Sequence, residues 1–254
     1  MQKEGEGMLT GMGILLVILI IYAGRMQSRN VLLSLAMNAA VLFGAVILMI
    51  FRVNPILLAW VCFFGISIIT LFYQNGVNSK TVAAFLALIV VVLLLSAGVW
   101  FLCNSAGICG LNGNTKQEDE VAFLDMHIHV NMVQVTYLII LLGLLGSVKD
   151  SAMAVATGTY EVFRDNPGIT RKELFRSGMQ IGRNILGVTI NTLLFAAAGE
   201  SVLMFHMYCV YQYSFAELIN SKSFFQEMIL MLAGGIGVEL AVPITAFILG
   251  ILCI

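Results

Sequence analysis

Amide, hydroxyl and carboxyl side chains are concentrated in one apolar stretch of the chain, residues 178–201. It carries Asn184, Thr189, Asn191, Thr192 and Glu200. Lipid offers such groups no hydrogen-bond partner, so in a membrane helix they face other helices or a wet cavity. We therefore interpret this stretch as the mechanistic centre of a polytopic membrane protein, suited to passing a polar solute or ion.

The two amides of this stretch share one helix face. Asn184, Gly187 and Asn191 have i, i+3, i+7 spacing, and Leu194 and Phe195 continue the same stripe. Two amides on one face make this the best single candidate for a substrate path. The alternative is packing between helices, in which the glycine permits close approach and the amides bridge to a neighbour.

Charged candidates lie on both sides of this stretch. Asp150 is expected where a span meets the cytoplasmic boundary, either as an ion- or proton-carrying carboxylate or as an interfacial Asp neutralised by Lys149. It is also a candidate N-cap of a following half-helix. Arg183 either holds an anionic group, pairs with Asp150, or anchors its helix at the inner interface.

Two glutamates lie within apolar runs, where an isolated charge is costly. Glu200 and Glu239 are therefore expected to be protonated, paired or facing water, unless Glu200 is nearer the outer interface. Glycines and a proline around Glu239 suggest a kinked or broken last helix that lines a site. The residues expected at close helix contacts are Gly178, Gly182, Gly187, Gly234, Gly235, Gly237 and Pro243.

Motifs for bond-making chemistry are missing from the sequence. Asp125, His127 and His129 alternate and face one way in an extended segment, but no fourth metal ligand accompanies them. Cys103 and Cys109 form a disulfide only if their loop faces outward. With no nucleotide loop, no nucleophile constellation and no H-E-x-x-H, we expect no catalysis, no metal site and no cofactor.

Composition separates this chain from soluble proteins. Hydrophobic residues make up 60% and charged residues 11%, whereas soluble domains carry about 25% charged residues. The net charge of -1, with no basic stripe, argues against nucleic acid. The lipid bilayer is the expected environment.

The hydrophobic pattern predicts an all-α, polytopic membrane helix bundle. It forms one domain over residues 1–254. Residues 8–128 hold the N-terminal helices and an outer loop, and residues 129–254 form the C-terminal half. About seven spans of adequate length occur at 8–24, 31–51, 56–73, 81–103, 129–148, 185–208 and 225–252. Residues 149–163 either continue the fifth span or form a re-entrant half-helix. Thr170 and Glu173 form a capping box that opens a short cytoplasmic amphipathic helix.

Lys and Arg predict the orientation, because they are retained on the cytoplasmic side. With the N-terminus outside and the C-terminus inside, nine of the 13 basic residues fall in inner loops and four in outer segments. The sequence thus predicts a multi-pass protein with its N-terminus out and its C-terminus cytoplasmic.

Several motifs in the C-terminal half resemble the YibE/F family of bacterial multi-pass membrane proteins. They are the segments 145–153, 169–183, 191–193 and 237–245, together with Gly187, in matching order and spacing. This chain has Asn184 where the family usually has Asp, and Lys149 where it usually has a small uncharged residue. Its length resembles the short, YibF-like form.

The resemblance implies a location in the bacterial cytoplasmic membrane and a possible transporter or permease. The leading hypothesis is a transport component with a polar path for an unknown small solute or ion. The residues expected near this path are Asp150, Arg183, Asn184, Asn191 and Glu239, and Thr192 and Glu200 are further candidates. The alternative is a non-transporting subunit that assembles with a longer YibE-like partner. A homo-oligomer is the other expected assembly.

Overall fold

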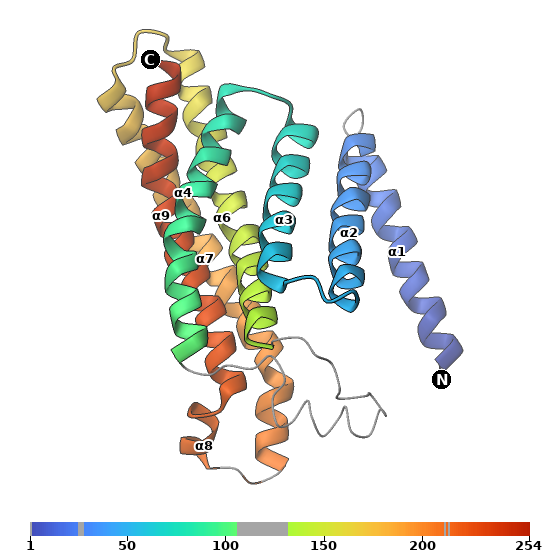
Figure 1. Ribbon diagram of the computed structural model, residues 1–254. Helices are drawn as coiled ribbons and strands as arrows, with labels where there is room; N and C mark the ends of the chain where they lie inside the picture. The colour runs from blue at the N-terminus through green and yellow to red at the C-terminus, as the bar shows by residue number, and fades with distance from the viewer. Residues whose placement is uncertain (1, 25–27, 106–131, 211, 213) are drawn as a thin grey trace.

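The computed structural model describes residues 2–24, 28–105, 132–210, 212 and 214–254. Within these residues the chain is helical throughout and contains no strand. The elements are α1 (Gln2–Gly24), α2 (Ser28–Ile50), α3 (Pro55–Ile68), the π-helical turn η2 (Ile69–Tyr73), α4 (Ser79–Ser105), α6 (Met132–Asp165), α7 (Arg171–Val210), α8 (Phe215–Ile219) and α9 (Lys222–Cys253). The N- and C-termini lie at opposite ends of the bundle (Figure 1).

The predicted polytopic helical bundle is confirmed. Six helices among the described residues are long and apolar enough to cross a membrane. They correspond to the second through seventh spans expected from the sequence. The first expected span corresponds to a shorter apolar stretch in α1, Thr10–Tyr22.

Local sequence signals determine where the helices begin. The Asn54 side chain accepts a hydrogen bond from the Ile56 N–H at 2.9 Å, and Pro55 occupies the first turn of α3, where no N–H is needed. The predicted capping box at α7 is present: the Thr170 N–H donates to Glu173 Oε2 at 3.1 Å, and the Glu173 N–H donates to Thr170 Oγ1 at 3.4 Å.

The possible re-entrant half-helix at 149–163 is not formed. Instead, α6 runs without a break from Met132 to Asp165. Nothing in that stretch breaks a helix, because the first proline after Val148 is Pro167, in the turn that follows α6. The fifth span was expected to end at residue 148, because the apolar run stops at Lys149 and Asp150. Charged residues alone, however, do not end a helix.

The short amphipathic helix expected after Thr170 is also not a separate element. Its residues are the first turns of α7, which continues through Gly178 and Gly182 to Val210. A glycine within a helix costs only about 1 kcal/mol relative to Ala, and packing readily offsets that cost. The basic flank and the polar helix therefore form one rigid rod.

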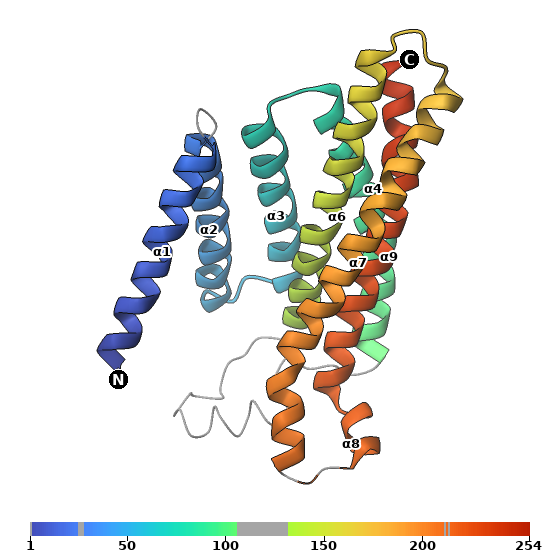
Figure 2. The ribbon, with the colours of Figure 1, turned by 180° about the vertical axis from the view of Figure 1, so that it is seen from behind.

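The core is built around α6, which packs against α3, α4, α7 and α9. Helices α6 and α9 run in the same direction, and α7 runs antiparallel to both (Figures 1 and 2). The hairpin of α1 and α2 is on the far side of α3 from this core, as both views show. The expected break in the last helix is not formed, because α9 continues through Pro243.

Candidate functional site

Helices α6, α7 and α9 meet in a common layer near the middle of the bundle. A Cβ atom added at Gly234 would lie 3.5 Å from both Leu193 Cδ1 and Ser147 Oγ. One turn further, a Cβ at Gly237 would lie 2.7 Å from Val148 Cγ2 and 3.1 Å from Leu95 Cδ1. Because Gly237 is near the centre of α9 (Lys222–Cys253), we refer to this region as the central layer.

Asp150 belongs to the central layer, close to the middle of α6. It follows Ser147 and Val148 by less than one turn, and its carboxylate lies 3.5 Å from Lys149 Nζ. The Lys149 side chain is only 15% exposed, whereas the Asp150 side chain is 76% exposed. An ion pair therefore lies at mid-depth on α6, with its cation covered by protein and its anion presented outward.

The other carboxylate of the central layer, Glu239, is also exposed. It lies on a stripe of α9 that includes Ile236 and Phe247, which are 50% and 61% exposed. No ion pair to Glu239 is formed among the described residues. A carboxylate at this depth faces either lipid, which strongly disfavours its charge, or a hydrated surface.

The polar residues of α7 are exposed as well. Asn184, Asn191 and Arg183 face outward, and Thr192 donates its hydroxyl to the Val188 carbonyl at 2.9 Å. The suggested pairing of Arg183 with Asp150 is not formed, since the carboxylate contacts Lys149 instead. Glu200 belongs to α7, but its side chain lies outside the described part of the chain.

The candidate packing glycines fall into two groups. Gly178 and Gly182 bring α7 close to α9, because a Cβ at Gly178 would lie 2.8 Å from Ala246 Cβ and one at Gly182 would overlap Val242 Cγ1. In contrast, a Cβ at Gly187 or Gly235 would meet nothing within 4 Å. Gly187 is thus not used for packing within the chain.

Three buried hydroxyl groups beside the central layer were missed by sequence reasoning. Ser151 and Thr159 on α6 and Thr245 on α9 are fully buried or nearly so, and each Oγ lacks a hydrogen-bond partner among the described residues. Thr159 lies at the contact of Gly178 with α9. A single Ser or Thr cannot be recognised from the sequence as part of a site, because it resembles an ordinary small core residue.

A second polar contact joins α2 to the bundle and was also missed. Asn38 donates to Thr70 Oγ1 at 3.1 Å, and Thr70 donates to the Ile66 carbonyl at 2.7 Å. Ser34 donates to Gln74 Oε1 at 3.4 Å. The signal was available in the helical spacing of Ser34 with Asn38. Thr70 lies in the π-helical turn η2, a feature frequent at functional sites.

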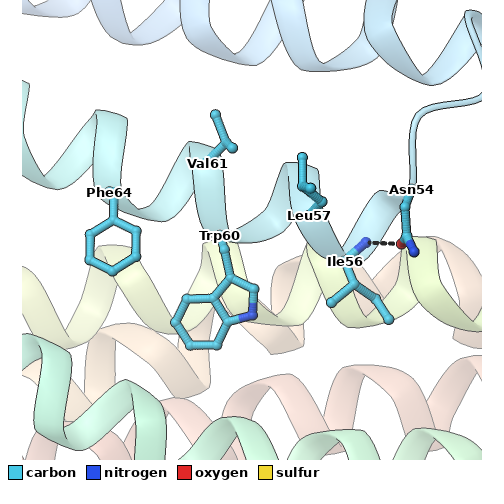
Figure 3. Close-up of a pocket in the computed structure, with 6 residues that line it drawn as sticks. All are labelled: Asn54, Ile56, Leu57, Trp60, Val61 and Phe64. Carbon is cyan, nitrogen blue, oxygen red and sulfur yellow. Dashed lines mark hydrogen bonds between the residues drawn. The ribbon is translucent and has the colours of Figure 1, made fainter.

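Two grooves on the surface of the described residues lie away from the central layer. One of about 620 Å³ follows α3, where Leu57, Val61, Trp60 and Phe64 line an apolar surface that ends at Asn54 (Figure 3). Another, of about 430 Å³, lies between Phe175 on α7 and the end of α9, with two basic side chains at its edge, Arg171 and Lys172. Both have the apolar lining expected of surfaces that contact lipid.

Some expectations fall on residues that the structure does not describe. They include the alternating Asp125, His127 and His129, and Cys109 of the suggested disulfide. Cys103 itself is buried near the end of α4. Among the described residues, no group of three or more His, Cys, Asp or Glu side chains is arranged to hold a metal ion.

Comparison with known proteins extends the resemblance beyond the C-terminal half. The model of a family described as YibE/F-like protein matches residues 12–254, which includes the N-terminal helices as well as the motifs around Asp150 and Asn191. No curated protein and no solved structure matches the chain. The chain belongs to the YibE/F family.

Proposed function

We propose that this protein is a component of a membrane transporter that moves a small solute or ion along a polar route beside α6, α7 and α9. The observation that carries the proposal is the exposure of Asp150 and Glu239 at mid-bundle depth. Ionisable groups at such depth are costly and characteristically line ion, proton or substrate pathways. The family match, with its implied permease role, points the same way.

Two further features support a route. The buried hydroxyls of Ser151, Thr159 and Thr245 extend polar character from the central layer toward the C-terminal end of α6. Gly178 and Gly182 place the α7 backbone directly against Ala246 and Val242 of α9. Relative motion of closely packed helices around a polar centre is how many secondary transporters alternate access.

The test is flux through the purified protein in liposomes of phosphatidylethanolamine and phosphatidylglycerol. A pH reporter is trapped inside, a potassium diffusion potential is imposed, and sodium, magnesium, phosphate and a mixture of amino acids are added in turn. We expect protein-dependent uptake of at least one probe, abolished by Asp150→Asn and by Glu239→Gln. The control Asp165→Asn removes an exposed carboxylate at the end of α6, paired only with its neighbour Arg164, and should leave uptake unchanged.

A second candidate is a non-transporting subunit that assembles with another membrane protein. It is favoured by the exposure of α7, of whose most apolar stretch only 6% is buried, against 44% in α4, α6 and α9. Asn191→Leu distinguishes the two. A transport path loses flux while any complex with a different membrane protein remains intact, whereas an assembly surface loses that complex.

A further inference from the structure

One face of α7 is left uncovered by the residues that the structure describes. Six residues spaced by three or four positions form it: Gln180, Asn184, Gly187, Asn191, Phe195 and Ala198, all exposed. Phe195 is 71% exposed, and Val188 and Val202 at the margins are 69% and 64% exposed. We call these six residues the amide face of α7.

Lipid alone is a poor neighbour for the amide face. The side chains of Asn184 and Asn191 make no hydrogen bond to any residue in the described part of the chain. Thr192 differs, because its hydroxyl is satisfied by the Val188 carbonyl of its own helix. Within the described part of the chain, the two amides thus retain unused donors and acceptors, which a second molecule can satisfy.

We infer that the amide face is covered by the same face of a second copy of this chain. An amide both donates and accepts, so two identical amides are complementary, as two identical charges are not. Copies inserted with the same topology bring α7 against α7 as parallel helices, and equivalent residues then lie at equal depth. Asn184 of one copy then contacts Asn184 of the other, and the two Asn191 side chains meet seven residues further along the helix.

The spacing fits such a pair closely. Seven residues are one heptad of a left-handed helix pair, and Asn at this position fixes parallel register. Gly187 lies between the amides, and the open space above it gives room for the partner helix to approach. Arg183 points about 100° away from Asn184, so the two copies do not bring their arginines face to face.

This inference goes beyond the proposed function, because copies would pair through α7 whether or not they transport. If transport is also correct, the second copy contributes Asn184 and Asn191 to the same polar region. Flux and pairing are measured separately, so one can fail without the other.

The test is cysteine cross-linking in native membranes. In a chain whose five cysteines are replaced, Asn191→Cys is compared with Ile236→Cys, which is 50% exposed on α9 near the same depth. Oxidation with copper phenanthroline should give covalent dimers from Asn191→Cys and Asn184→Cys, while Ile236→Cys remains monomeric. Dimer formation no greater than that of Ile236→Cys, or an adduct with a different protein, would overturn the inference.

A second measurement avoids introduced thiols. Single-molecule photobleaching of tagged protein in native-lipid discs should show two steps for most wild-type particles. Asn191→Leu is expected to weaken association about three- to twentyfold, and Gly187→Leu to abolish it by filling the contact. Ile236→Ala is the control. Single-step bleaching of the wild-type chain, or unchanged pairing in Gly187→Leu, would contradict the proposed interface.

Discussion

The Lys149 ammonium lies 3.5 Å from the Asp150 carboxylate in the middle of α6, with the lysine largely covered and the aspartate open. Adjacent residues on a helix do not face each other, so the contact depends on the long lysine side chain reaching across. The pair gives α6 both a cation and an anion at the depth where α6, α7 and α9 meet. It also explains how two charges persist within a membrane-spanning helix.

Removing the charge of Asp150 should destabilise the protein more than removing the charge of Lys149. Asp150→Asn leaves the covered Lys149 without a counter-charge, and leaving a buried donor unsatisfied costs about 1–3 kcal/mol. Lys149→Met leaves only the exposed carboxylate and should cost about 1 kcal/mol. The double variant should be more stable than the sum of the two effects indicates. Thermal unfolding in lipid discs measures this, and strictly additive losses would show that the two charges do not interact.

Glycine positions on α7 should separate intramolecular packing from the open face. Gly178→Ala forces a methyl group to within 2.8 Å of Ala246 Cβ, and such overpacking costs about 1–3 kcal/mol. Gly187→Ala meets open space within the chain and should leave the fold of a single copy unharmed or slightly stabilised, by about 0.5–1 kcal/mol. Unfolding of monomeric protein in detergent provides the comparison. Equal destabilisation by both substitutions would contradict the described packing.

The polar contact between Asn38 and Thr70 should hold α2 against the bundle. Thr70→Val removes the acceptor of the Asn38 amide, whose Oδ1 is already buried without a partner among the described residues. The expected loss is about 1–3 kcal/mol, expressed locally as faster hydrogen exchange in α2. Ile68→Val, at an exposed position two residues away, is the control. Exchange in α2 that is unchanged by Thr70→Val would show that the contact contributes little.

Basic residues cluster at one end of the bundle, where we expect the cytoplasm. The ends of α6 and α7 carry Arg164, Arg171 and Lys172 at this end, whereas Lys222 begins α9 at the opposite one. In a chain without native cysteines, Ser214→Cys should react with an impermeant maleimide added outside intact cells. Lys172→Cys should react only after the cells are opened. The reverse pattern would invert the orientation.

Much of the fold could be predicted from sequence, because membrane helices depend on long apolar runs. The errors occurred where a charged residue was taken as the end of a membrane-spanning helix. Lys149 and Asp150 appeared to end a span, yet a helix continues through charges when no Pro intervenes and the charges pair. The depth of Asp150 follows from the approach of its neighbours Ser147 and Val148 to glycines of α9, which a one-dimensional pattern does not contain.

The candidate site was predicted in part. Periodicity correctly placed Asn184, Gly187 and Asn191 on one face of a helix, since this depends only on helical geometry. Whether that face points into the bundle depends on which side of α7 meets α9, and Gly178 and Gly182 decide this by their close contacts. The hydroxyls of Thr159 and Thr245 gain significance only from burial.

The most direct measurement asks whether the carboxylates of the central layer face water or lipid, and it requires no known substrate. Asp150→Cys and Glu239→Cys are placed in the cysteine-free chain, and their reaction rates with a charged, water-soluble methanethiosulfonate are measured in native membranes. The lipid-facing control is Leu94→Cys, at an apolar position of α4 that is 60% exposed. A polar route predicts that both cysteines react rapidly while the control does not, because only a hydrated thiol ionises and meets the reagent. Rates at positions 150 and 239 no faster than at 94 would contradict a polar route along α6, α7 and α9.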